Sequence, residues 1–302
     1  MKVLNTSDRI RTAHIEGCVT LDEEQLKQLQ STLLSMLKDI STVMEENMIS
    51  YSLGGGSVLG AVRHNGFIPW DDDIDINIPR SEFERFLPLF EERFGDRYWI
   101  HVPGRTKGYA LLFPQIRLKG TSVRTRDDLN NDECGACIDF FYMENTYDNG
   151  LKRFIHGFGC QYHGFAVSCR KFYRDRKGII DFAKKTADQK LLRAARIKVF
   201  CGFFFALCDI DKMVKRADKW NGKCKDTGSC YVVFPAGRNH FFGELYRRNV
   251  AFPGERKDFE NLRIPCPSDS DSYLKHLYGE YMNIPQEADR ESHIFFEPFT
   301  LS

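Results

Sequence analysis

The sequence lacks a long apolar run, a strong net charge and an apolar N-terminal segment, and each absence excludes a class of protein. Its longest apolar run, VFCGFFFALC at residues 199–208, is far shorter than the ~20 residues that a membrane-spanning helix needs. We expect this run to form a buried helix, with contact at a membrane interface as the less favoured alternative. The formal net charge of the 302 residues is +1, so the chain as a whole gives no electrostatic reason to bind nucleic acid.

Residues 1–17 contain no apolar core of the kind that a signal peptide has. We therefore expect a cytoplasmic protein whose ten cysteines are reduced thiols rather than a disulfide framework. Cys134 and Cys137 have the C-x-x-C spacing of zinc sites, but no second such pair and no spaced pair of histidines completes four ligands. The sequence therefore does not predict a structural zinc site.

The pattern of apolar residues predicts an α+β protein. Two capping boxes, Thr20 with Glu23 and Ser81 with Glu84, open amphipathic helices. The predicted helices of this part lie at residues 20–46, 57–64 and 81–94, and the predicted strands at 48–53, 73–79, 97–102, 109–118 and 136–143.

The second half of the chain is helical and basic over residues 151–219, and short strands and loops follow from Gly228 up to a last helix at about 272–282. No repeat or clear linker separates these parts. We therefore expect a single domain over residues 1–302. Its parts are a core at about 20–145, a helical basic insertion at about 150–225 and a C-terminal region at about 230–302.

Four of the five residues from 71 to 75 are aspartates, in the run DDDIDINIP. Carboxylates so close together repel one another and are costly to bury, so they need a cation or a proton. Isoleucines alternate with polar residues from position 73 to 79, which predicts a strand. On such a strand Asp73 and Asp75 stand about 6.6 Å apart on one face, a separation that can close around one or two metal ions.

Three other interpretations of this part of the chain fail on the residues that they require. An EF-hand loop needs glycine at its sixth position, where this chain has Ile76. The run GGGSVLG at residues 54–60 has neither the G-x-G-x-x-G spacing of a dinucleotide-binding fold nor the Gly-Lys-Ser/Thr of a P-loop. Instead, a strand, a glycine turn and a helix opened by Ser57 present backbone N–H groups that can bind a phosphate.

A third acidic position lies in the predicted strand at 136–143, where Asp139 stands among apolar residues. The alternative to a functional role is that Asp139 is a structural residue, a core aspartate paired with another buried group. Together with the aspartate pair and the glycine turn it describes a nucleotidyltransferase-like metal site. Phosphoryl transfer needs positioned reactants and neutralised phosphate charge, and carboxylate-held metal ions supply both.

The segment GGGSVLGAVRHNGFIPWDDDIDINIPRSEFERF closely resembles the signature of the LicD family of phosphocholine transferases, relatives of fukutin and the fukutin-related protein in the polymerase-beta-like nucleotidyltransferase superfamily. The resemblance continues in RLKGTSV, GACIDFFYME and YLKHLYGEYMNIPQEADRESH. It covers most of residues 20–145 and 250–293, and little of 150–230. It implies a polymerase-beta-like nucleotidyltransferase core, a mixed sheet with flanking helices, to which the helical part is an elaboration.

The resemblance implies that Asp73, Asp75 and Asp139 are the catalytic carboxylates and the ligands of Mg²⁺ or Mn²⁺. In that superfamily the third carboxylate lies beside the acceptor hydroxyl, so Asp139 is also the candidate general base. We rank Asp71 and Asp72 lower, as supporting or solvent-facing residues.

The donor site follows from the same resemblance. Gly55, Gly56 and Ser57 are implied to form the glycine-serine turn that takes up donor oxygens. Arg63 and His64 are candidates for binding the donor phosphates, although as a pair they equally suit the C-terminal end of a helix.

Trp70 is a candidate face for a quaternary ammonium, which aromatic rings bind well, although an aromatic beside a strand is more often core. Two features depart from the family pattern. Gln115, which we count among the substrate-binding residues, stands where the family commonly has a lysine, and Tyr142 and Glu144 stand where it has proline and aspartate. These departures leave the three carboxylates intact and concern the substrate pocket.

The implied reaction is transfer of phosphocholine from CDP-choline to a hydroxyl of a cell-surface glycan or of its lipid-linked precursor. Other CDP-linked donors, carrying phosphoethanolamine, ribitol phosphate or an aminoalkylphosphonate, stay open, as does a non-catalytic module that binds a nucleotide or glycan. The near-neutral charge argues against nucleic acid. Residues 170–198 hold eleven Lys and Arg against three Asp, which suits a solvated helix face, an anionic acceptor or peripheral contact with the inner membrane face.

Overall fold

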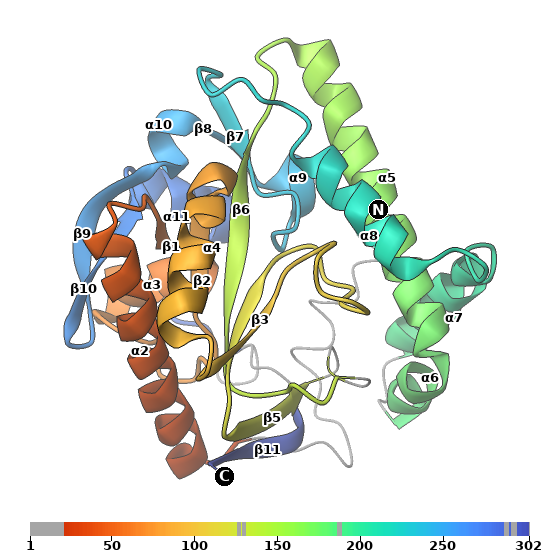
Figure 1. Cartoon of the computed structure of the whole chain (residues 1–302), viewed down its shortest axis with the longest axis horizontal. Coiled ribbons are helices and arrows are strands. Elements are labelled where there is room, and N and C mark those ends of the chain that lie inside the picture. Colours follow the sequence, from red (N-terminus) through yellow and green to blue (C-terminus); the bar gives the residue numbers. More distant parts are fainter. Residues whose placement is uncertain are drawn as a thin grey trace.

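The computed structural model describes residues 21–125, 128, 131–185, 189–286, 290 and 295–301 (Figure 1). Its helices are α2 (Glu23–Glu46), α3 (Gly55–His64), α4 (Arg80–Phe94), α5 (Gly150–Arg174), α6 (Arg176–Lys185), α7 (Gln189–Phe203), α8 (Ile210–Asn221), α9 (His240–Gly243), α10 (Arg248–Ala251) and α11 (Ser270–Tyr278). Its strands are β1 (Ser52–Leu53), β2 (Asp75–Pro79), β3 (Tyr98–His101), β4 (Gln115–Leu118), β5 (Thr121–Thr125), β6 (Cys137–Asn145), β7 (Tyr231–Val233), β8 (Leu245–Arg247), β9 (Pro253–Phe259), β10 (Leu262–Pro267) and β11 (Phe295–Leu301).

A mixed sheet forms the centre of the described structure. Its strands follow the order β1-β2-β6-β4-β3, and the far end of the long strand β6 also pairs with β7, which pairs with β8. Strands β2 and β6 run parallel, whereas the other pairs are antiparallel. This arrangement confirms the predicted α+β class. The polymerase-beta-like identity of the core stays a prediction.

The main hydrophobic core joins α2 and α4 to one face of this sheet (Figure 1). Helix α2 contributes an apolar stripe that is fully buried, and its members are Leu29, Leu33, Met36, Leu37, Ile40 and Met44. The predicted capping box with Thr20 is wrong in register. Asp22 is the N-cap instead: its side chain accepts from the Gln25 N–H, and the Gln25 side chain accepts from the Asp22 N–H. Thr20 lies outside the described residues.

The starts of two other elements differ from the sequence prediction. Helix α3 begins at Gly55, two residues before Ser57, because the glycine turn itself enters the helix. Helix α4 begins at Arg80 directly after Pro79, so Ser81 lies inside the helix and its predicted capping box is wrong. Strand β2 begins at Asp75, which leaves Asp73 in the preceding loop.

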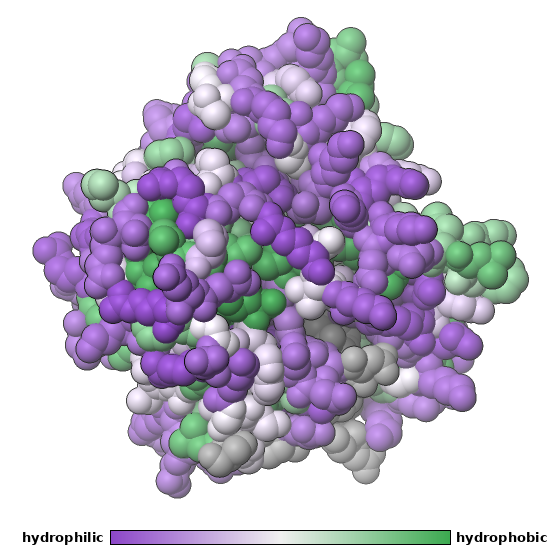
Figure 2. All heavy atoms as spheres, viewed as in Figure 1, coloured by the Kyte–Doolittle hydropathy of each residue, from purple (hydrophilic) through white to green (hydrophobic). Residues whose placement is uncertain are grey.

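Helices α5 to α8 form a group at the right of Figure 1 with small hydrophobic clusters of their own. The predicted burial of residues 199–208 is wrong. Helix α7 ends at Phe203, and Phe200, Phe204 and Leu207 are 65%, 70% and 103% exposed, because no described element covers this end. Figure 2 shows apolar side chains at the top and right-hand rim, where α5 begins and α7 lies. No described helix is long and apolar enough to cross a membrane.

Candidate active site

The paired strands β2 and β6 bring two of the predicted carboxylates together. Asp75 and Asp139 are directly opposite each other in the parallel register, and the Asp139 N–H donates to the Ile74 carbonyl over 3.1 Å. On the other side of Asp139, Gln115 of β4 is its antiparallel partner. Since residues opposite each other on neighbouring strands share a face of the sheet, these three side chains lie on one face.

The loop before β2 adds three more carboxylates. Oxygens of Asp71, Asp72 and Asp73 lie within 4.8 Å of one another, and Asp72 is buried. Burial raises the pKa of Asp71 well above its ordinary value, and the charges of Asp73, Asp72 and Asp75 raise it further. Asp71 and Asp72, which we ranked lower from sequence, are therefore part of the same acidic centre as Asp73 and Asp75.

The glycine turn lies against this acidic centre. Gly55 has a positive φ of 43°, and a methyl group placed on it would lie 2.5 Å from Asp75 Oδ2. A methyl group on Gly56 would lie 3.1 Å from Asp71 Oδ2. The Ser57 hydroxyl accepts from the Asp75 N–H over 3.0 Å. Glycine is therefore required here so that backbone can approach the carboxylates.

The predicted phosphate-facing role of the Gly55 N–H does not fit the structure, because this N–H donates to the Tyr273 hydroxyl over 3.1 Å. The buried Asn77 amide donates to the same hydroxyl, also over 3.1 Å. The Tyr278 hydroxyl lies 3.7 Å from a methyl group placed on Gly55. Helix α11 thus buttresses the turn. The sequence patterns assign no role to Tyr273 and Tyr278, although both stand in the segment YLKHLYGEYM.

Gln115 is buried and supports the third carboxylate. Its Nε2 donates to Asp139 Oδ1 over 2.8 Å, and its Oε1 accepts from Arg117 Nη2 over 2.7 Å. Arg117 is buried in an ion pair with Asp128 at 2.8 Å. In this structure Gln115 therefore orients Asp139, whereas the sequence prediction assigned it to substrate.

Arg63, His64 and Trp70 lie together at the far end of α3. Arg63 Nη1 donates to the Tyr281 carbonyl over 2.6 Å, and its Nε donates to His64 Nε2 over 2.9 Å. Burial and the neighbouring Arg63 lower the pKa of His64, which fits a neutral acceptor ring. The Arg290 guanidinium lies 4.4 Å from the Trp70 ring centroid. The Trp70 ring therefore already faces a cation, and Arg63 ties α3 to the C-terminal segment.

Tyr142 and Glu144, which depart from the family pattern, belong to a buried ion-pair cluster. Arg80 pairs with Glu144 and, at 2.8 Å, with Asp218 of α8, and its guanidinium lies 4.0 Å from the Tyr142 ring centroid. This cluster joins β6 to α8. Along β6, Glu144 lies beyond Tyr142 and therefore farther from Asp139. The cluster links the sheet to the helical part of the chain.

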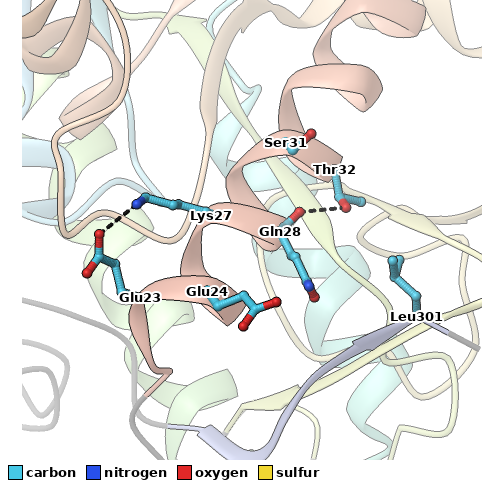
Figure 3. A pocket seen from close by; sticks show the side chains of 7 residues that line it. All are labelled: Glu23, Glu24, Lys27, Gln28, Ser31, Thr32 and Leu301. Atoms are coloured by element: carbon cyan, nitrogen blue, oxygen red, sulfur yellow. Dashed lines mark hydrogen bonds and ion pairs between the residues drawn. The ribbon is translucent and has the colours of Figure 1, made fainter.

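A groove among the described residues lies away from this centre. It has a volume of about 670 Å³ between the start of α2 and β11 (Figure 3). Lys27 there pairs with Glu23, and Thr32 donates to the Gln28 carbonyl (Figure 3). These polar groups bind one another instead of converging on the groove, so we place no site there.

Comparison with known proteins gives a family match for the part of the chain that holds most of this site. Residues 48–128 match the family described as LicD/FKTN/FKRP, nucleotidyltransferase domain, a range that holds the glycine turn, the Asp71–Asp75 segment and Gln115. Asp139 lies beyond it.

Among individual proteins, the chain is 25% identical to the lipopolysaccharide cholinephosphotransferase LicD of Haemophilus influenzae, over 91% of this chain and 98% of that protein. It is 39% identical to an uncharacterized protein of Rickettsia prowazekii over 24% of this chain and 31% of that one. It is 53% identical to the human ribitol 5-phosphate transferase FKRP over 36 residues, which are 12% of this chain and 7% of FKRP. Residues 48–128 thus match the LicD/FKTN/FKRP family, and the chain is similar to LicD over most of its length.

Proposed function

We propose that this protein is a metal-dependent transferase that moves a phospho-head group from a CDP-linked donor to a hydroxyl of a glycan or of a lipid-linked glycan precursor. The observation that carries the proposal is the register of β2 and β6, which sets Asp75 opposite Asp139 beside the glycine turn. The relatives with assigned activities are named cholinephosphotransferase and ribitol 5-phosphate transferase, which supports phosphotransferase chemistry in this chain.

The acidic centre fits a hard divalent cation. Its donors are carboxylate oxygens, which Mg²⁺ and Mn²⁺ prefer, and several of them are crowded enough to raise the pKa of Asp71. Asp73, Asp75 and Asp139 would hold Mg²⁺ or Mn²⁺, with Asp71 beside them. The ion would neutralise the charge of the donor diphosphate.

The protein's own groups then perform the remaining tasks. Gln115 holds the Asp139 carboxylate in one orientation, in which it accepts the proton of the attacking acceptor hydroxyl. The turn at Gly55 keeps backbone close to Asp75, so the diphosphate can approach the acidic centre closely. The acceptor oxygen forms the new P–O bond, and cytidine monophosphate leaves.

CDP-choline is our first choice of donor, because the LicD relative is matched over nearly its whole length. Ribitol phosphate is the second, since the FKRP match is short but 53% identical. Phosphoethanolamine and aminoalkylphosphonates share the same chemistry and belong in the same assay. A choline group that used the Trp70 ring would have to share it with Arg290 or displace it.

The test is release of cytidine monophosphate from a panel of CDP-linked donors, with Mg²⁺ or with EDTA, by the wild type and by Asp75→Asn. The matched control is Asp271→Asn, whose carboxylate is exposed and pairs with Lys275. We expect one donor to be cleaved by the wild type and the control only with metal, and at least about 100-fold more slowly by Asp75→Asn. Equal cleavage by Asp75→Asn would contradict the site assignment.

A non-catalytic binding module predicts a different result. Such a protein would bind a CDP-linked donor, measurable by calorimetry, without releasing cytidine monophosphate in the presence of any glycan acceptor offered. Five carboxylates brought close together by folding argue against this alternative, because an idle site gains nothing from their repulsion.

A further inference from the structure

Helix α5 exposes an apolar stripe along most of its length. Its exposed large side chains recur at intervals of three or four residues, which places them on one face of the helix. They are Leu151 (70% exposed), Phe154 (59%), Ile155 (52%), Phe158 (63%), Tyr162 (54%) and Phe165 (38%). An exposed stripe of this size on a folded protein marks an interaction surface.

The end of α7 continues this stripe. Cys169 lies five helical turns after Leu151 on the same face of α5, and it is fully buried under α7. A methyl group placed on Gly202 of α7 would lie 2.1 Å from the Cys169 carbonyl oxygen, so the two helices are in close contact there. The exposed side chains at this end of α7 are Phe200, Phe203, Phe204 and Leu207. We call these four and the six of α5 the apolar face.

Basic residues border the apolar face. Arg193 and Arg196 are exposed on α7, and they precede Phe200 and Phe203 by seven residues each, which puts all four on one side of the helix. From residue 151 to 207 the chain has thirteen Lys and Arg, three Asp and no Glu. Aromatic side chains next to arginines and lysines are the composition of helices that lie in the interface of an anionic bilayer.

We propose that the apolar face and its basic border dock this protein on the surface of an anionic membrane. The positive charge of the basic border favours an anionic membrane over a second copy of the chain as the partner of the apolar face. A symmetric dimer would place the same basic border against itself, and like charges across an interface are repulsive. Docking is an interfacial contact, consistent with the finding that no described helix can span a bilayer. It goes beyond the transfer reaction and does not depend on it.

The test is co-sedimentation with vesicles of phosphatidylcholine alone or with about one-third phosphatidylglycerol, a fraction that gives a strongly negative surface. One variant combines Phe158→Ser, Phe203→Ser and Phe204→Ser; a second combines Arg193→Glu and Arg196→Glu. Matched controls are Met48→Ser, 85% exposed at the end of α2, and Lys38→Glu, exposed on α2. Circular dichroism confirms that each variant is folded.

We expect the wild type and both controls to bind the anionic vesicles and each test variant to bind at least about tenfold more weakly. A higher salt concentration should weaken the binding of the wild type to the anionic vesicles. The proposal is overturned if the wild type stays in the supernatant with anionic vesicles, or if the triple serine variant binds as the wild type does.

Sedimentation velocity without lipid decides between the membrane and a second copy. We expect the 35.0 kDa monomer. A dimer that the triple serine variant converts to monomer would overturn the proposal. Metal-dependent cleavage of the water-soluble donor, measured without vesicles, should be the same in all of these variants, so a failure of docking and a failure of the transferase assignment give different results.

Discussion

Gln115 donates its side-chain amide to the Asp139 carboxylate over 2.8 Å while its own carbonyl oxygen accepts from Arg117. Arg117 is fixed in turn by its buried ion pair with Asp128. A chain of buried contacts therefore sets the orientation of the carboxylate that we propose as general base. Such supporting contacts commonly change the activity of a metal site by 10- to 100-fold, to order of magnitude.

The first prediction concerns this glutamine. Gln115→Leu should lower kcat for donor cleavage by about 10- to 100-fold with little change in KM, because the site is assembled but Asp139 is no longer held. Since a hydrogen bond to the charged form of a carboxylate favours that form, the acid limb of the pH–rate profile should also move to higher pH. Gln28→Leu on the exposed side of α2 is the control. A loss of activity without any shift of the profile would indicate a structural role alone.

The second prediction concerns the glycine turn. Gly55→Ala should lower the free energy of unfolding and impair metal-dependent cleavage, because the new methyl group is placed 2.5 Å from Asp75 Oδ2. Gly120→Ala is the matched control, since Gly120 also has a positive φ, of 74°, but has open space around it. The control should lose only about 1 kcal/mol, from backbone strain. Equal losses measured by urea unfolding would show that the contact with Asp75 is unimportant.

The third prediction compares two stacked tyrosines, whose ring centroids lie 5.0 Å apart. Tyr273→Phe should lower the free energy of unfolding by about 2 to 4 kcal/mol, because the Gly55 N–H and the buried Asn77 amide lose their shared acceptor. Tyr246→Phe should be neutral or stabilising, because the buried Tyr246 hydroxyl has no hydrogen-bond partner among the described residues. Urea denaturation of both variants tests this. The reverse order of stability would contradict the hydrogen-bond assignment.

Local patterns predicted much of this fold. The periodicities of α2, α4 and β6 were read correctly to within a few residues, because each is set by side chains close in sequence. The helical character of residues 151–219 was predicted for the same reason. Element starts were less accurate, as at α3 and α4, because a cap depends on the geometry of the preceding turn.

Contacts between distant parts of the chain could not be predicted in this way. Gly55 and Tyr273 are separated by 218 positions, and no local pattern joins them. The register that places Gln115 beside Asp139 depends on how β4 enters the sheet. The exposure of Phe200 and Leu207 follows from the absence of a covering element among the described residues, which hydrophobicity alone does not reveal.

The fourth prediction concerns the ion pairs of Arg80. Arg80→Met should lower the free energy of unfolding by about 3 to 5 kcal/mol, because the buried Glu144 carboxyl would lose the cation that compensates its charge. Arg85→Met is the control. Arg85 pairs with Glu82 on the surface of α4, where such a pair contributes less than about 1 kcal/mol. Adding Glu144→Gln to Arg80→Met should recover part of the loss; no recovery in thermal or urea unfolding would mean that packing on Tyr142 dominates.

The last prediction concerns the pH dependence of stability. Glu244 is buried, which raises its pKa to about 7 in the folded protein, against about 4.3 in an unfolded chain. As pH rises through this window, the unfolded state loses its proton first, so the folded state loses relative stability, by roughly 4 kcal/mol in total. Glu244→Gln keeps an oxygen for the Asn239 N–H and has no proton to lose. The variant should therefore match the wild type near pH 4 and become progressively more stable than it up to about pH 8.

Urea unfolding at several pH values measures this difference. The exposed Glu255→Gln variant should show none, and a Glu244→Gln difference that stays constant with pH would exclude Glu244 as the titrating group.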